Sequence, residues 1–172
     1  FVSPIKSVGH GITCVSDLHE EEEVWKVMLE LSQDIGHRLR LHKLKASGVQ
    51  ISVRSNDLGY RQFQGKLTLA TQSPLIIAER ARKLFKDNYH WTFPVREITV
   101  RAIDLRPKDE PEQTDLFTDM HRLDRLDRLD ECVEEIRCRF GKKAVYPAVL
   151  MGDLKMPNDG RDLVRMPGLM YR

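Results

Sequence analysis

Gln113, Asp115, Leu116 and Phe117 are the residues of this chain whose types and spacing most clearly suggest a chemical role. They lie in an acidic segment interrupted by prolines, which has too few apolar residues to form a packed core of its own. A leucine–phenylalanine pair in such a segment has nothing local to cover it. The chemistry that this pattern predicts is recognition, in which the two apolar side chains anchor the segment in a pocket of a partner protein.

The sequence shows no pattern that would predict catalysis or metal binding. A glycine-rich phosphate loop, a His-Glu-x-x-His helix and a Gly-x-Ser-x-Gly turn are all absent from it. The six histidines have no ligand spacing, and the cysteines at 14, 132 and 138 form no Cys-x-x-Cys pair, which argues against a zinc site and fits a reducing cytoplasm. Glu20–Glu23 is interpreted as a solvated helix start. We therefore expect no catalytic residue, no metal site and no cofactor in this chain.

Size and composition predict a globular protein with one compact domain, or a domain of about 100 residues with appendages. The chain has 172 residues, of which 41% are hydrophobic and 31% are charged. No run approaches the roughly 20 apolar residues of a membrane span, so we expect a cytoplasmic protein with no membrane partner. The sequence begins at Phe1 without a signal peptide, as a piece of a longer protein would.

The net charge is only +2, but the charges are unevenly distributed. Between His37 and Lys66, seven lysines and arginines accompany a single acid, Asp57. Between Pro107 and Asp119, one lysine accompanies five acids. A basic region beside an acidic segment predicts a polyanionic partner for the first and repulsion between the two.

Hydrophobic periodicity predicts an α+β fold in the first hundred residues. Apolar residues at helical spacing follow Asp17, a candidate N-cap, as far as Leu41, and a second helix begins at Ser73-Pro74. Alternating residues predict four strands, at Lys6–Cys14, Val49–Arg54, Gln62–Leu69 and Val95–Leu105. The order is β-α-β-β-α-β, which predicts a four-stranded antiparallel or mixed sheet with a central hairpin and both helices on one face.

The C-terminal part begins with Arg-Leu-Asp repeated three times in tandem from Arg122. Apolar residues continue from Leu126 to Phe140 at three- and four-residue steps, which predicts one amphipathic helix that ends at Gly141 and carries ion pairs along its surface. Its leucines have to pack on the main domain or on another chain. The predicted division is a sheet domain at 1–106, an acidic linker at 107–118, the helix at 119–141 and an irregular tail at 142–172.

The predicted sheet has one face that no helix covers. Its outward residues are hydroxyls, amides, cations and bare glycine backbone, and Glu97 is the only acid expected among them on the last strand. Such groups bind phosphate oxygens without reading bases. A plain solvated face is the alternative, although it would normally mix both signs of charge. No aromatic or aliphatic side chain is expected on this face, which favours contact with a nucleic-acid backbone over stacking on bases.

The first hundred or so residues resemble the C-terminal, "little finger" domain of the Y-family translesion DNA polymerases. The resemblance rests on Lys6-Ser7-Val8-Gly9 with Thr13, on Leu39–Lys45 and on Pro94–Arg101. It is strengthened by Gln113–Phe117, which is similar to the Gln-x-(Asp/Ser/Leu)-Leu-Phe peptide that binds bacterial sliding clamps. The long segment beyond this peptide looks more like the UmuC-type branch of the family than the DinB type.

The resemblance implies that the open sheet face lies in the major groove of a primer–template duplex and grips both DNA backbones during damage bypass and repair. The phosphate contacts that it implies are Ser7, Thr13, Arg54, Gln64, Lys66, Thr68, Arg96, Thr99 and Arg101. Glu97 departs from the family pattern, since some relatives are basic there. The polymerase's catalytic carboxylates, which hold Mg²⁺, belong to a palm domain that this chain lacks, so we expect that the chain alone cannot polymerise.

Two partner questions stay open on the sequence alone. An accessory protein could bind the C-terminal helix or the tail. In a different reading, the chain is a stand-alone ferredoxin-like interaction or ligand-binding module that dimerises through the Arg-Leu-Asp helix. That reading predicts no affinity for DNA and an oligomer whose population rises with concentration. The sheet topology is compatible with either reading, because fold alone does not determine function.

Overall fold

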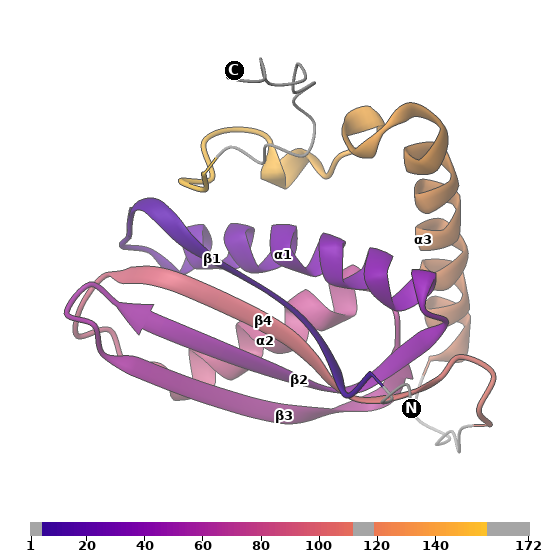
Figure 1. Cartoon of the computed structure of the whole chain (residues 1–172), viewed down its shortest axis with the longest axis horizontal. Helices are drawn as coiled ribbons and strands as arrows, with labels where there is room; N and C mark the ends of the chain where they lie inside the picture. Colours follow the sequence, from indigo (N-terminus) through magenta and orange to yellow (C-terminus); the bar gives the residue numbers. More distant parts are fainter. Residues whose placement is uncertain (1–4, 112–118, 158–172) are drawn as a thin grey trace, which may run out of the picture.

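The computed structural model describes residues 5–111 and 119–157 (Figure 1). The elements follow the predicted β-α-β-β-α-β order and are then joined by a further helix. They are β1 (Ser7–Leu18), α1 (Glu21–Leu41), β2 (Leu44–Ser55), β3 (Tyr60–Thr71), α2 (Pro74–Asn88), β4 (Val95–Pro107) and α3 (Met120–Phe140). Two short 3₁₀ turns, Lys142–Ala144 and Ala148–Leu150, complete the described part. No helix in these ranges is long and apolar enough to cross a membrane.

The sheet has the strand order β1-β4-β2-β3, and every neighbouring pair is antiparallel. The predicted hairpin is the β2–β3 pair, whose turn is held by the Asp57 carboxylate. This carboxylate accepts hydrogen bonds from the Ser55 hydroxyl at 2.5 Å and from the Gly59 backbone N–H at 3.0 Å. β4 lies between β1 and β2, so the last strand of the motif occupies the middle of the sheet and β3 forms one edge.

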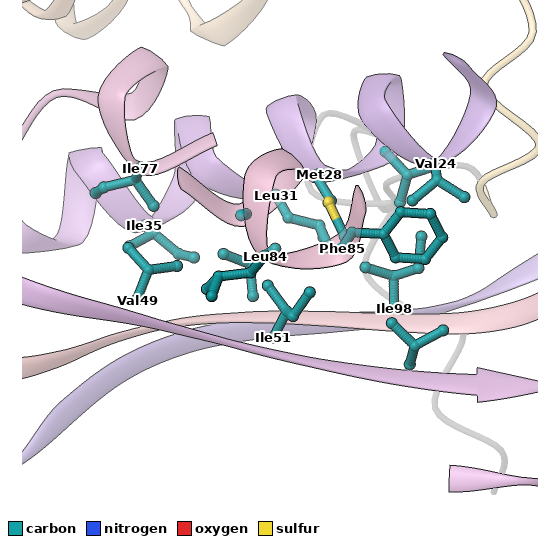
Figure 2. Packing of buried hydrophobic residues seen from close by; sticks show 14 of the residues in the cluster. Val24, Met28, Leu31, Ile35, Val49, Ile51, Ile77, Leu84, Phe85 and Ile98 are labelled. Atoms are coloured by element: carbon teal, nitrogen blue, oxygen red, sulfur yellow. The ribbon is translucent and has the colours of Figure 1, made fainter. Parts of the chain in front are cut away.

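The hydrophobic core lies between the sheet and the two helices α1 and α2 (Figure 2). The predicted helical stripes are buried, and so are the alternate residues of the central strands: Val24, Met28, Leu31, Ile35, Leu39, Ile77, Ala81, Leu84, Phe85, Val49, Ile51, Val53, Ile98, Val100 and Ala102. Full burial of a large apolar side chain contributes about 1.5–3 kcal/mol. Because strand residues alternate between faces, this packing turns the intervening polar residues to the opposite side of the sheet.

The N-cap predicted for α1 is wrong. β1 runs on to Leu18, and the helix begins after Glu20. There the Glu23 carboxylate accepts hydrogen bonds from the backbone N–H groups of His19, at 2.7 Å, and Glu20, at 3.3 Å. Asp17 is used elsewhere, because its carboxylate accepts a hydrogen bond from Arg96 at 2.8 Å. The start of α2 is as predicted in position, with Ser73 at the N-cap and proline at the first helical position, but the Ser73 side chain makes no capping hydrogen bond.

α3 crosses the end of α1 and stands beside the sheet (Figure 1). It is held there mainly by charged groups: Asp130 lies 3.2 Å from Arg40, Glu134 pairs with His37, and Arg137 donates to Gln33 at 3.0 Å. The ion pairs predicted along the helix itself are not found among the described residues. Three acids of α3 pair with other elements instead: Asp130 and Glu134 with α1, and Glu131 with Lys108.

The apolar stripe predicted for α3 is only partly buried. Leu129 is 56% exposed and Phe140 is 75% exposed, and no residue of the helix is fully buried. The helix begins at Asp119, whose carboxylate accepts a hydrogen bond from the Arg122 backbone N–H at 3.0 Å, and it ends at Gly141, where φ is 95°. The glycine stop is as predicted, since this φ favours a residue without Cβ.

Residues 142–157, which we call the strap, fold back over the helices on the side opposite the open sheet face (Figure 1). Leu150 is buried against Leu29 and Ala78. Glu30 accepts hydrogen bonds from the Lys142 ammonium and the Tyr146 hydroxyl, each at 2.8 Å. Residues 142–157 are therefore a packed part of the fold, although they contain little regular structure.

Candidate nucleic-acid interface

The outer face of the sheet, which we call the open face, carries four rows of residues that cross all four strands. Each row is set by the antiparallel register and contains one residue from β1, β4, β2 and β3 in that order. The rows are Ser7, Ile103, Gly48 and Lys66; Gly9, Arg101, Gln50 and Gln64; Gly11, Thr99, Ser52 and Gln62; and Thr13, Glu97, Arg54 and Tyr60. Side chains from strands far apart in sequence therefore form one continuous polar surface.

Two glycines of β1 make room for side chains of β4. A Cβ on Gly9 would lie 3.1 Å from the Arg101 side chain, and a Cβ on Gly11 would lie 2.2 Å from the Thr99 hydroxyl oxygen. The sequence predicted that these glycines expose bare backbone. In the structure Gly11 is exposed and Gly9 is half-buried, and Arg101 and Thr99 lie close to them, so the glycines bring a cation close to the plane of the sheet.

Hydrogen bonds link neighbouring strands along the middle rows. Arg101 Nη1 donates to Gln50 Oε1 at 3.4 Å, and Gln50 Nε2 donates to Gln64 Oε1 at 3.3 Å. Tyr60, from the row of Arg54, places its hydroxyl 3.0 Å from both Ser52 Oγ and Gln62 Oε1 of the neighbouring row. These links restrict the rotamers of exposed side chains, which reduces the entropy that would be lost when a ligand binds.

The electrostatic character of the open face is set by three cations. Arg54 pairs with Glu97 at 3.3 Å, whereas Lys66 and Arg101 lie in no ion pair among the described residues. One further acid reaches this face. Asp104 has a φ of 52°, which breaks the alternation of β4, and its Oδ2 lies 3.2 Å from where a Cβ on Gly48 would be. The expectation that Glu97 is the only acid on this strand's outer face is therefore wrong.

Eight of the nine predicted phosphate contacts lie on the open face. Ser7, Thr13, Arg54, Gln64, Lys66, Thr68 and Arg101 are exposed, and Thr99 is half-buried. Arg96 is the exception. It sits at a register shift between Glu97 and Val95, and its guanidinium is engaged by Asp17. The hydrogen bond from Arg96 lowers the pKa of Asp17, so a phosphate would have to compete with this carboxylate for Arg96.

Sequence reasoning missed two apolar contributions to the open face. Tyr60 is 52% exposed in the row of Arg54, and Ile103 is half-buried over Gly48. The face was expected to have neither aromatic nor aliphatic residues. Tyr60 lies outside the predicted strand Gln62–Leu69, whereas β3 already begins at this residue. Tyr60 is two residues before Gln62 and four before Gln64, so the alternation of strand residues could have assigned it to the same face.

The predicted partner-binding residues Gln113, Asp115, Leu116 and Phe117 lie outside the described residues. Both flanks of their segment are anchored to the folded body. On one side, the Lys108 backbone N–H donates to the Lys43 carbonyl oxygen at 2.8 Å, and the Lys108 ammonium pairs with Glu131 at 2.9 Å. On the other side, residue 119 begins α3.

The described residues hold no cluster of three or more histidine, cysteine, aspartate or glutamate side chains that could bind a metal ion. The acids of the open face, Glu97 and Asp104, are separate and one of them is paired. What the arrangement can do chemically is present hydroxyl, amide and cationic donors on a broad, shallow surface. These are donors for phosphate oxygens, and phosphate contacts of this kind do not depend on the base sequence.

Comparison with known proteins gives a consistent result. Residues 5–116 match the impB/mucB/samB family C-terminal domain. A DNA polymerase IV from Acetivibrio thermocellus is 37% identical over 150 residues, which cover 87% of this chain and 38% of that protein. A DNA polymerase IV from Desulfatibacillum aliphaticivorans is 30% identical over 155 residues, covering 89% of this chain and 39% of that protein. The chain thus spans less than two fifths of the length of these relatives.

A solved structure, described as a complex of the beta-clamp processivity factor and the little finger domain of PolIV, shares the fold. It matches with a TM-score of 0.50 and 19% identity, over 65% of this chain and 99% of that one. The predicted resemblance to the little-finger domain is confirmed. The matches of 150 residues or more to relatives named DNA polymerase IV have to include α3. The length of the segment beyond residue 118 therefore does not favour the UmuC-type branch.

Proposed function

The chain belongs to the impB/mucB/samB family through its C-terminal domain, and from this membership we propose that it is the DNA-holding and clamp-tethering C-terminal region of a translesion DNA polymerase. The relatives that it matches are named DNA polymerase IV. In this proposal, the parent protein performs Mg²⁺-dependent nucleotidyl transfer with residues outside this chain. The chain itself supplies attachment, first to the duplex and second to the sliding clamp.

The observation that carries the DNA-holding role is the open face. It combines cations that lie close to the sheet, such as Arg101 over Gly9, with amides and hydroxyls linked across the strands. Phosphates satisfy these donors whatever the base sequence. α1, α2 and the strap lie on the other side of the sheet and α3 stands beside it (Figure 1), so a duplex can approach the open face without displacing any described element.

The clamp-tethering role is supported by the sequence of residues 113–117 and by the relative that was solved with a beta-clamp. Burial of Leu116 and Phe117 in a clamp pocket would contribute about 3–6 kcal/mol in gross terms. Ordering the segment costs about 2–5 kcal/mol, so the peptide alone binds weakly. Its value lies in raising the local concentration of the chain near DNA on which a clamp is loaded.

The DNA-holding role is tested by measuring duplex binding by fluorescence anisotropy at several salt concentrations. If about four phosphates are engaged, affinity falls by ~100-fold between about 50 and 200 mM salt. Arg101→Gln lowers the affinity and makes the salt dependence shallower by about 0.9 in log–log slope. Arg61→Gln, on the opposite side of β3, is the matched control and leaves both unchanged. Binding that is insensitive to salt, or that differs strongly between duplex sequences, contradicts the proposal.

One observation favours a second candidate, in which the chain associates through α3. Leu129 and Phe140 expose most of their side chains on this helix. Association of this kind is visible by light scattering as a mass that rises with concentration. Leu129→Gln would abolish it without altering duplex affinity. If the chain is a monomer at all concentrations and binds DNA in a salt-dependent manner, association through α3 is rejected and the DNA-holding role is retained.

A further inference from the structure

A groove of about 510 Å³ runs beside the outer edge of β3 and lies between α2 and the first turns of α3. Its apolar lining includes Leu67 on β3, Ile76 on α2, and Leu123 and Leu126 on α3. Its rim is charged. The groove exists only because α3 docks against the body, and it includes residues of the Arg-Leu-Asp repeat to which the proposed function assigns no task.

The groove is rich in cations without carboxylate partners. Lys66, Arg80, Lys83 and Arg122 line it, and none of them lies in an ion pair among the described residues. Two acids, Glu79 and Asp119, also line the groove. The Asp119 carboxylate is already occupied as the cap of α3. The four cations therefore outnumber the two acids, one of which already caps α3, and this positive charge favours an anionic ligand.

Arg80 gives an independent indication of the same kind. Its guanidinium packs beneath β3 at Gly65, where a Cβ would lie 2.2 Å from Nη2. The side chain is half-buried, and its Nε is fully buried without a hydrogen-bond acceptor among the described residues. A guanidinium withdrawn from water costs free energy unless an anion or another acceptor satisfies it. The missing Cβ of Gly65 thus leaves room for a guanidinium that lines the groove and keeps its positive charge there.

The groove is continuous with the open face, because Lys66 and Thr68 belong to both. We propose that the groove binds the sugar–phosphate backbone of a single nucleic-acid strand that leaves the duplex held on the open face. This proposal rests on the proposed function. The volume is that of a small-ligand site, which admits one strand and not a duplex. The leucines provide a surface for sugars and bases, and the cations contact the phosphates.

The experiment compares two DNA probes, a blunt duplex and the same duplex with a single-stranded thymidine extension, by anisotropy with the full chain. The wild-type chain binds the extended probe about tenfold more tightly. Lys83→Gln/Arg122→Gln, two exposed residues, removes this gain and makes the salt slope for the extended probe shallower by about 1.4. Its affinity for the blunt duplex stays within about twofold of wild type. Lys26→Gln/Arg139→Gln, which removes the same charges outside the groove, keeps the gain.

The outcomes separate this inference from the function on which it rests. If the wild-type chain binds the blunt duplex and the extension adds nothing, the groove proposal is overturned and the DNA-holding role stands. Equal loss of the gain in both double variants also overturns it, since the effect would then be one of net charge. An acidic, leucine-containing peptide that binds the groove while the extension adds nothing would assign the groove to a protein partner. If neither probe binds, both proposals fail.

Discussion

Close approach at the surface of β1 shows how single residues shape the open face. Gly9 and Gly11 stand opposite Arg101 and Thr99, and any side chain at either glycine would meet the β4 residue within about 3 Å. A larger residue would lift the Arg101 guanidinium away from the sheet and from Gln50. Small residues on an edge strand therefore determine where the cation on the neighbouring strand is placed.

Replacement of Glu97 by glutamine tests whether the open face meets an anion. Glu97→Gln removes a negative charge and frees Arg54, so duplex affinity rises about threefold at low salt. Stability changes by less than about 1 kcal/mol, because Arg54 is 45% and Glu97 31% exposed in this pair. Both quantities are measured by anisotropy and by urea unfolding. Glu135→Gln, which removes an exposed acid from α3, is the control, and an equal rise in both variants would show that only net charge matters.

At the level of single residues, sequence reasoning succeeded where the alternation of strands is regular and did not succeed where it breaks. Arg54, Gln64, Lys66 and Arg101 lie on regular stretches, and period-two counting placed them on the open face. Asp104 and Arg96 lie at irregularities, where a positive φ or a register shift changes which face a residue occupies. No local sequence pattern predicts these irregularities, because they arise from pairing with a strand that is distant in the sequence.

The elements of the core could be predicted because each carries its own hydrophobic period. α3 and the strap could not be placed in the same way. The contact between α3 and α1 consists of long-range pairs such as Arg40 with Asp130 and Arg137 with Gln33, and charged residues on a helix fit a solvated surface equally well. In the described part of the strap, Leu150 alone is fully buried, while Tyr146, Leu154 and Met156 are partly buried against the helices and the core. Apolar residues scattered irregularly through a proline-containing segment have no period from which burial could be inferred.

The strap provides a test at the level of elements. Leu150→Ala removes the side chain buried against α1 and α2 and lowers the free energy of unfolding by about 2–3 kcal/mol. Val149→Ala, in the same turn and 42% exposed, changes it by less than about 0.5 kcal/mol. Duplex affinity is the same in both variants, since the strap lies away from the open face. Reduced DNA binding by Leu150→Ala at a temperature where it is folded would contradict this arrangement.

The reactivity of Cys14 tests the packing of the strap, because the strap lies next to this residue. Val15 donates its backbone N–H to Lys155 at 2.8 Å, and burial raises the pKa of the Cys14 thiol from 9.0 to about 11. The folded state keeps the thiol protonated where the unfolded state ionises, so Cys14 contributes stability that is lost as pH rises from 9.0 towards 11. In Cys132→Ser/Cys138→Ser, alkylation of Cys14 by iodoacetamide at pH 9 is slow, and Leu150→Ala accelerates it. Equal rates with and without Leu150→Ala would show that the strap does not shield this thiol.

For the molecule as a whole, the proposed attachments are a rigid surface for DNA and a segment whose two flanks are fixed to that same body. Lys108 is bonded to Lys43 and Glu131, and α3 starts immediately after the segment. Fixed flanks keep the peptide at residues 113–117 within a short reach of the sheet domain. A partner that binds this peptide therefore acts on the sheet domain at an effective concentration that can reach the millimolar range.

This coupling predicts how the chain binds primer–template DNA on which a clamp has been loaded. The wild-type chain binds such DNA ~100-fold more tightly than the same DNA without a clamp, because the second attachment is intramolecular. Leu116→Ala/Phe117→Ala loses this gain and keeps its affinity for free DNA, since the open face is unchanged. Thr114→Ala alters the variable position of the peptide and keeps the gain, which makes it the matched control. Surface plasmon resonance on immobilised DNA with and without a loaded clamp measures all of these affinities. Equal binding of the clamp-loaded DNA by the wild type and the double variant would show that the peptide has no part in the proposed function. The DNA-holding role would then remain, because it does not depend on the peptide.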